Sequence, residues 1–195
     1  MAAGSSSVEQ EDLPVTEVAS PATIGLDLAS EEEFVALLRQ ADAQIFSGWG
    51  PYDGKLNGVN MLLFFAGVFD RRIMESLSVL VEMTIHLLTD VLPQQGVVVL
   101  SGCGTSGRVA YIVATSLNRV LVAAGQAPRF AYLISGGDAA LLLSDELPED
   151  DPHTGIAQLQ EWVKGRPQFI YIGISCGLSA PYVAGQVSWA MKQPQ

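Results

Sequence analysis

The chain has 195 residues, of which 49% are hydrophobic and 16% are charged, so it has enough apolar side chains to form a core and is not wholly disordered. Ten Lys and Arg against 21 Asp and Glu give a net charge of −11, which argues against a nucleic-acid-binding protein and against a polybasic membrane anchor. Two Cys and two His are too few for a disulfide framework or a zinc site. We therefore expect no metal and no cofactor.

No segment of the sequence has the pattern of a signal peptide or a membrane span. Residues 1–7 are small and polar, and the longest apolar run, Met61–Phe69, is far shorter than the ~20 residues needed to cross a bilayer. The sequence therefore predicts a soluble, intracellular protein that binds neither membranes nor nucleic acid.

Residues 1–29 are predicted to be a flexible acidic tail, because eight acidic residues and no Lys or Arg occur before residue 34. Ser30 and Glu33 then match a capping box, in which the Ser hydroxyl and the Glu carboxylate satisfy free backbone N–H groups. Apolar residues follow at helical spacing. Residues 30–95 are accordingly predicted to be an N-terminal helical segment.

The middle of this helical segment lacks a clear pattern. Residues 47–60 are rich in Gly, Pro, Asp and Asn and are predicted to be a loop. The apolar run that follows has neither helical nor strand periodicity. A helix from about residue 71 to residue 92 comes next, and Pro93 ends it.

From Gly96 onward, short apolar strands alternate with helices. Strands are predicted at 97–100, 130–134 and 169–174, and helices at 106–124, at 154–164 and from Ala180 onward. A weaker helical stretch at 139–144 and an acidic loop at 145–151 lie between the second strand and the second helix. This order predicts an α/β fold, a parallel sheet with flanking helices and right-handed crossovers. Because three strands make a narrow sheet, we expect residues 96–195 to be an incomplete domain.

The turn after the first of these strands, residues 101–108, has the composition of a phosphate-binding loop. Ligands of open parallel sheets bind beyond the carboxyl ends of the strands. There, Gly102, Gly104 and Gly107 allow close approach of the backbone, and the following helix directs its free N–H groups to the same place. The loop after the third strand, residues 175–179, also has hydroxyl groups and also precedes a helix. Two such loops on neighbouring strands would hold one phosphate from both sides.

The same three glycines spell G-x-G-x-x-G, which leaves a nucleotide-binding module as an alternative. A dinucleotide site needs an acidic residue at the end of the second strand, about 20 residues further on. Here Asp138 comes 31 residues after Gly107. Arg108 is the only basic residue in these loops, although a phosphate usually attracts more positive charge. An ordinary strand-to-helix turn is the other alternative.

The acidic loop and the two cysteines carry weaker signals. Glu146 and Glu149 can bind sugar hydroxyls or act as acid or base, with a solvated charge cluster as the alternative. Cys103 and Cys176 have no nearby His to activate them, so we interpret both as small space-filling residues.

Three motifs in chain order, Ser101–Arg108, Leu133–Asp138 and Gly173–Gly185, resemble those of the sugar isomerase (SIS) domain family. The resemblance covers residues from about 35 to 48 and from 71 to 195. Residues 54–70 have no counterpart in it, so we interpret them as an inserted stretch. The family implies a flavodoxin-like α/β fold that binds phosphosugars. The motifs are most similar to the branch of the family that inhibits glucokinase, in which fructose 6-phosphate favours and fructose 1-phosphate opposes the inhibition.

The resemblance also implies a role for each loop. Gly104 would leave room for the sugar, Thr105 and Ser106 would donate hydrogen bonds to the phosphate or the sugar, and Glu149 would accept from sugar hydroxyls. Residues 175–177 would close the phosphate pocket. The phosphosugar-binding residues expected on this basis are Gly104, Thr105, Ser106, Gly107, Glu149, Ser175, Cys176, Gly177 and Ser179.

By this resemblance the chain is expected to be a regulatory binding protein without catalytic activity, in the cytoplasm and nucleus. Its expected partners are fructose 6-phosphate or fructose 1-phosphate, and glucokinase. The enzyme alternative is a phosphosugar lyase or isomerase similar to the N-acetylmuramic acid 6-phosphate etherases, in which acidic residues act in elimination. Residues 145–151 depart from the Glu-Gly-x-Glu-Asp-Ser pattern of those enzymes. Full-length regulators of the family continue with a second SIS domain and a helical cap, which supply further ligand groups.

Overall fold

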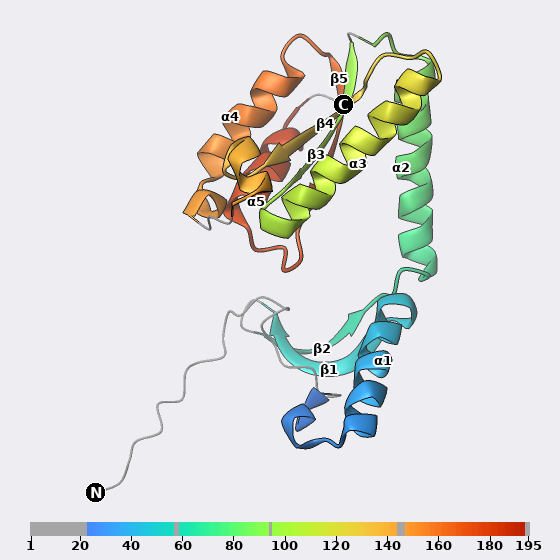
Figure 1. Cartoon of the computed structure of the whole chain (residues 1–195), viewed down its shortest axis with the longest axis vertical. Coiled ribbons are helices and arrows are strands. Elements are labelled where there is room, and N and C mark those ends of the chain that lie inside the picture. The colour runs from blue at the N-terminus through green and yellow to red at the C-terminus, as the bar shows by residue number, and fades with distance from the viewer. Residues whose placement is uncertain (1–22, 57–58, 94, 144–146, 194–195) are drawn as a thin grey trace, which may run out of the picture. The chain divides into compact units, whose positions relative to one another are not determined.

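The computed structural model describes residues 23–56, 59–93, 95–143 and 147–193, so most of the predicted acidic tail lies outside the described residues. The chain divides into two compact units, Met1–Ser78 and Val79–Gln195 (Figure 1). The division groups the second half of the helix at residues 71–89 with the sheet, whereas the sequence placed this helix with the N-terminal segment.

The first unit begins, in its described part, with a short 3₁₀ helix, η3 (Leu26–Leu28), and the helix α1 (Glu31–Ser47). The predicted capping box is confirmed. The Ser30 hydroxyl accepts a hydrogen bond from the backbone N–H of Glu33 at 3.4 Å, and the Glu33 carboxylate accepts one from the backbone N–H of Ser30 at 2.9 Å. The Ser30 hydroxyl also donates to the Glu33 carboxylate at 2.8 Å. The bonds that the backbone N–H and the hydroxyl of Ser30 donate to the carboxylate hold the pKa of Glu33 below its usual range, because they stabilise the charged form.

A β-hairpin follows α1, made of the antiparallel strands β1 (Trp49–Leu56) and β2 (Val59–Phe65) (Figure 1). The prediction of a loop over residues 47–60 is therefore wrong for the residues in these strands. Pairing with the apolar β2 orders a stretch whose own composition favours turns. The two residues between the strands, Asn57-Gly58, are a known sequence signal for a hairpin, and the prediction of a loop did not use it. The hairpin joins residues 49–53 to residues inside the 54–70 stretch, and the interpretation of that stretch as an insertion stays a prediction.

The second unit is a three-stranded parallel sheet with helices on both faces, as predicted (Figure 1). The strand order is β4-β3-β5, so the first strand in sequence is central. The strands are β3 (Gly96–Gly102), β4 (Phe130–Ile134) and β5 (Gln168–Ile174), and the helices are α2 (Arg71–Thr89), α3 (Gly104–Ala123), α4 (Pro152–Val163) and α5 (Pro181–Ala190). Two 3₁₀ helices, η4 (Gly137–Leu141) and η5 (Leu147–Asp150), lie between β4 and α4.

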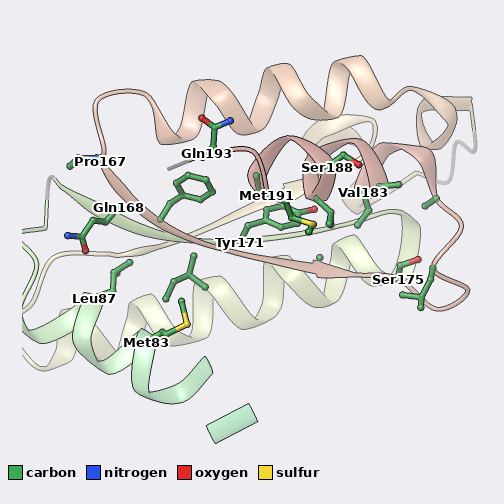
Figure 2. A pocket seen from close by; sticks show the side chains of 18 of the residues that line it. Met83, Leu87, Pro167, Gln168, Tyr171, Ser175, Val183, Ser188, Met191 and Gln193 are labelled. Carbon is green, nitrogen blue, oxygen red and sulfur yellow. The ribbon is translucent and has the colours of Figure 1, made fainter. Parts of the chain in front are cut away.

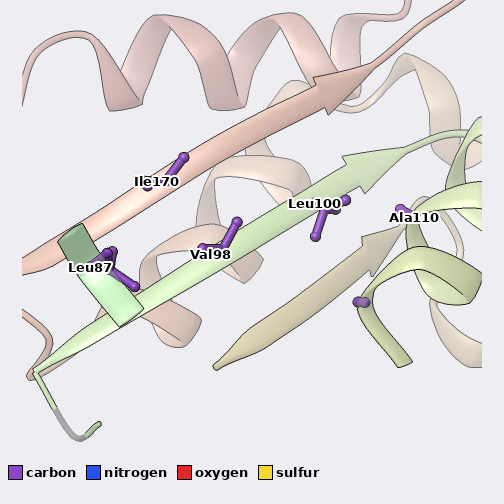
Figure 3. Close-up of a cluster of buried hydrophobic side chains, with 6 residues drawn as sticks. Leu87, Val98, Leu100, Ala110 and Ile170 are labelled. Atoms are coloured by element: carbon purple, nitrogen blue, oxygen red, sulfur yellow. The ribbon is translucent and has the colours of Figure 1, made fainter. Parts of the chain in front are cut away.

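The core consists of two apolar clusters, one on each face of β3, whose residues are all buried. On one face, Val98 and Leu100 pack against Leu87 of α2, Ala110 of α3 and Ile170 of β5 (Figure 3). The other face packs against α4 and α5. Its buried members are Val97, Val99, Ala131, Leu133 and Leu159. Burial on both faces explains why β3 reads as a continuous β-branched run rather than an alternating one.

The register of the strands brings their carboxyl ends together. Gly102, the last residue of β3, pairs with Ile134 of β4 and with Ile174 of β5. The loops that follow all three strands therefore begin at one edge of the sheet, which is where ligands bind in open parallel sheets.

A groove of about 1330 Å³ runs along β5 in the second unit (Figure 2). Its lining includes Tyr171 of β5, Val183 and Val187 of α5, and Met83 of α2. In the described part of the chain, β5 pairs on one side only, with β3, and its sequence has no charged residue and no Pro. Edge strands without such residues pair with other chains, so we expect this edge to favour self-association.

We predict that Gln168→Lys, which places a charge at an exposed residue of the edge strand β5, reduces concentration-dependent association in light scattering. Ile112→Lys adds the same charge on an exposed residue of α3 and should leave the association unchanged. A wild-type chain that stays monomeric at every concentration, or an equal response of the two variants, would contradict this prediction.

Candidate functional site

A cavity of about 420 Å³ lies where the loops after β3 and β5 meet η5. It brings together residues that lie far apart in the sequence and that were predicted to act together. The predicted site residues that line it are Gly104, Thr105, Ser106, Glu149, Ser175, Cys176, Gly177 and Ser179. Of the predicted set, Gly107 is the one that does not line it.

The N-terminus of α3 forms one wall of this cavity. The helix begins at Gly104, two residues before the predicted start. Its N-cap residue is Cys103, whose side chain makes no capping hydrogen bond. The first-turn N–H groups of a helix have no partner within the helix, and the helix dipole is positive there. Thr105 is exposed and Ser106 is half-buried, so two hydroxyl donors accompany these N–H groups. This wall is suited to a negatively charged group.

Glu149 lies opposite the start of α3. Gly104 has a φ of +48°, a conformation that favours glycine, and a methyl group added there would lie 3.3 Å from Oε1 of Glu149. Burial, and to a smaller extent the charge of Glu149, raise the pKa of the Cys103 thiol to about 11. Cys103 is therefore a neutral thiol near pH 7 and not a nucleophile. Glu146 lies outside the described residues.

Gly107 lies beneath the loop rather than in the cavity. It is buried, and a methyl group there would lie 2.4 Å from Cγ1 of Ile134 and 2.7 Å from the carbonyl oxygen of Gly102. Glycine is thus needed here for the close packing of α3 on the ends of β3 and β4. The expected part of Gly107 in binding the phosphosugar, through close approach of the backbone, stays a prediction.

The cavity has no positively charged side chain in its lining, as far as the structure describes it. Arg108 points away from it and donates to the carbonyl oxygens of Leu141 at 3.3 Å and Leu143 at 3.2 Å. Glu149 and Asp150 make the lining acidic. Anion binding would therefore depend on backbone N–H groups and hydroxyls.

Cys176 is exposed in this lining, so its interpretation as a space-filling residue is wrong.

A buried hydrogen-bond network behind the cavity was not predicted. Gln186 of α5 is fully buried, and its Oε1 accepts from the Ser101 hydroxyl at 2.6 Å and from the Tyr171 hydroxyl at 2.7 Å. Its Nε2 donates to the carbonyl oxygen of Gly155 at 2.9 Å. Polar residues within otherwise buried segments were the available signal, but their partners lie up to 85 residues apart.

The features that a dinucleotide or a metal would need are not gathered at this cavity. Asp138 accepts a hydrogen bond from the Tyr132 hydroxyl at 2.8 Å and is not part of the lining. Across the described ranges, no group of three or more His, Cys, Asp or Glu is placed to hold a metal ion. Over the same residues, no helix is both long enough and apolar enough to span a membrane.

The parallel sheet, with its loop cavity at the carboxyl ends of the strands, defines an α/β domain of the SIS type. The family model for the glucokinase regulatory protein N-terminal SIS domain matches residues 80–191, nearly the whole second unit. The chain therefore belongs to the glucokinase regulatory protein N-terminal SIS domain family.

Curated relatives of two kinds are similar to this chain. The glucokinase regulatory protein of Xenopus laevis is 35% identical over 183 residues, which are 94% of this chain and 28% of that protein. That of Homo sapiens is 39% identical over 179 residues, 92% of this chain and 27% of that protein. An N-acetylmuramic acid 6-phosphate etherase of Pseudothermotoga lettingae is 30% identical over 175 residues, 90% of this chain and 49% of the enzyme. The chain thus spans just over a quarter of the length of the regulatory proteins.

Proposed function

We propose that the chain binds a phosphorylated sugar, fructose 6-phosphate or fructose 1-phosphate, in the cavity between the loops after β3 and β5. The observation that carries the proposal is the meeting of two hydroxyl-bearing loops at the N-terminus of α3. A phosphate there would accept from backbone N–H groups and from Thr105, Ser106 and Ser175. Charge-assisted hydrogen bonds of this kind contribute roughly 1.5–3 kcal/mol each.

Glu149, one of the two carboxylates in the lining, fits the sugar part of such a ligand. The Glu149 carboxylate would repel a phosphate, but it accepts hydrogen bonds from hydroxyl groups. A ligand with its phosphate at the N–H groups and hydroxyls of the two loops and its sugar hydroxyls toward Glu149 satisfies both kinds of polar group in the cavity. An unphosphorylated sugar would lose the first interaction, and inorganic phosphate would lose the second.

We further propose a regulatory role, with glucokinase as the protein partner and without catalysis by this chain. The two glucokinase regulatory proteins, which match more than nine-tenths of this chain, support the partner. The raised pKa of Cys103 supports the absence of catalysis by that thiol. On the same family grounds we propose that the chain acts in the cytoplasm and the nucleus.

The etherase relative and the position of Glu149 favour one alternative, a phosphosugar lyase. A carboxylate beside a bound sugar can accept a proton in an elimination. Turnover of N-acetylmuramic acid 6-phosphate by the wild-type chain, lost in Glu149→Gln, would establish this alternative. Binding of a dinucleotide in preference to a sugar phosphate would instead favour the nucleotide-binding alternative.

The proposed function predicts that Ser106→Ala weakens fructose 6-phosphate binding by about tenfold or more, since it removes one donor to the phosphate; about 1.4 kcal/mol corresponds to each tenfold step. Calorimetric titration with fructose 6-phosphate, fructose 1-phosphate and fructose measures the effect. Ser175→Ala should weaken the same ligands from the other loop.

Ser116→Ala is the matched control, because Ser116 is an exposed residue of the same helix far from the cavity. It should bind like the wild type. If Ser106→Ala leaves the affinity for both fructose phosphates unchanged, Ser106 is not part of the site and the turn serves only to join β3 to α3.

A further inference from the structure

The helices α4 and α5 pack so closely at Gly155 and Gly185 that neither position has room for a side chain. A methyl group on Gly185 would lie 2.7 Å from Cβ and 2.9 Å from the carbonyl oxygen of Pro152. A methyl group on Gly155 would lie 2.6 Å from the carbonyl oxygen of Tyr182. Any side chain at either position must therefore move one helix away from the other.

The network of Gln186 ties the same helix to three other elements. Its amide bonds to Ser101 of β3, Tyr171 of β5 and Gly155 of α4, at 2.6 to 2.9 Å. The side chain is fully buried, so these bonds cannot be replaced by bonds to solvent. Gly185 sets the spacing of α5 from α4, and Gln186 sets its position relative to the sheet.

Both contacts involve segments that adjoin the lining of the cavity. Pro152 is the first residue of α4 and follows η5, which carries Glu149 and packs against α5. Ser101 is the second-last residue of β3, two residues before Cys103, which lines the cavity. The helix α5 begins at Pro181, directly after the loop at 175–179 and its N-cap residue Ala180. The helix α5 therefore contacts or adjoins the segments that lead into all three parts of the cavity wall.

We propose that Gly185 and Gln186 are positioning residues that hold Glu149 at the cavity, facing the start of α3. The role of Glu149 toward a sugar rests on the proposed function, but its placement does not depend on any ligand. In this placement a methyl group on Gly104 would lie 3.3 Å from Oε1 of Glu149. The charge of Glu149 is also near enough to Cys103 to raise the pKa of its thiol. A shift of α5 moves Pro152, and with it Glu149, away from both.

Cys103 reports this placement without a ligand. Its thiol pKa is raised to about 11, partly by the charge of Glu149, so loss of that charge increases the thiolate fraction. In a Cys176→Ser background, iodoacetamide alkylation at about pH 8.5 measures that fraction. We expect Glu149→Gln to accelerate alkylation severalfold. Gly185→Ala should also accelerate it, while alanine keeps the helix because it favours helical backbone more than glycine does.

The double variant Gly185→Ala/Glu149→Gln distinguishes an effect on the position of Glu149 from a general loosening of the packing around Cys103. If Gly185 acts through Glu149, Gly185→Ala adds no further acceleration once Glu149 is Gln. Additive effects, or no effect of Gly185→Ala alone, would overturn the proposal. An unchanged rate in Glu149→Gln would overturn it too, since Glu149 would then not stand beside Cys103. Gln186→Met, which removes the network but keeps the volume, should behave as Gly185→Ala does.

Ser188→Ala is the matched control, because it also introduces alanine into α5. Ser188 lines the groove along β5 and not the cavity (Figure 2). Its alkylation rate should equal that of the parent. Titration of each variant with fructose 6-phosphate then tests the link to ligand binding. A wild-type chain that does not bind fructose 6-phosphate would refute the proposed function, whereas the alkylation cycle would still decide the positioning.

Discussion

Gly107→Val is expected to destabilise the second unit strongly, and not merely to weaken the binding of a ligand. Its Cβ would lie 2.4 Å from Cγ1 of Ile134 and 2.7 Å from the carbonyl oxygen of Gly102, and the second of these atoms belongs to the backbone of the central strand. Overpacking of a core costs about 1–3 kcal/mol when side chains alone can move aside. Because backbone must also move here, we expect the free energy of unfolding to fall by about 3 kcal/mol or more.

Urea unfolding followed by circular dichroism measures this loss. Ser116→Val is the control, because it places the same β-branched residue on an exposed position of α3. Its cost should be small, about the difference in helix propensity of well under 1 kcal/mol. If Gly107→Val unfolds at the urea concentration of the wild type but no longer binds fructose 6-phosphate, Gly107 belongs to the ligand site and not to the packing beneath it.

Arg129→Met is expected to have a destabilising effect of similar size. The guanidinium is buried and donates to the carbonyl oxygens of Leu87 at 2.5 Å, Val91 at 2.9 Å and Gly96 at 3.1 Å. It thereby joins the end of α2, and the turn after it, to the start of β3. Methionine fills much of the same volume but removes all three charge-assisted hydrogen bonds to these carbonyls. Each such bond contributes about 1.5–3 kcal/mol, so we expect a loss of about 3 kcal/mol or more.

The same urea experiment tests this expectation, with Arg119→Met as the control for the loss of one positive charge. Arg119 is exposed on α3, so its replacement should change the free energy of unfolding by less than about 0.5 kcal/mol. Arg129→Lys should lie between the two, because an ammonium group cannot reach all three carbonyls at once. Equal stability of Arg129→Met and Arg119→Met would show that the three bonds do not stabilise the fold.

The second unit was predictable because its signals are local. β4 was predicted at its observed bounds, and β3 extends the predicted strand by one residue before it and two after it. Short apolar runs separated by amphipathic helices are sufficient for a parallel α/β fold. The hairpin of β1 and β2 was missed because its first strand has the composition of a turn and is ordered by its partner. The Asn57-Gly58 pair between the two strands is the local signal from which a hairpin could have been predicted.

The candidate site was predictable as a set of loops but not in its internal arrangement. The carboxyl ends of parallel strands meet at one edge, so the loops at 101–108 and 175–179 could be paired from sequence. The sequence did not indicate that Arg108 turns away toward η4 or that Gly107 lies beneath the loop. The network of Gln186 depends on contacts between four elements, and spacing within one element does not reveal it.

Binding of a phosphosugar between the two loops is tested most directly by nuclear magnetic resonance of the isotope-labelled chain during titration with fructose 6-phosphate. We predict saturable shifts of the backbone amides of Gly104, Ser106 and Gly177, with fructose at the same concentrations causing none of them. The amides of Tyr171 and Val187, which line the groove along β5, should stay unchanged. Shifts confined to that groove, or no saturable shift at the start of α3, would contradict the assignment of this cavity as the phosphosugar site.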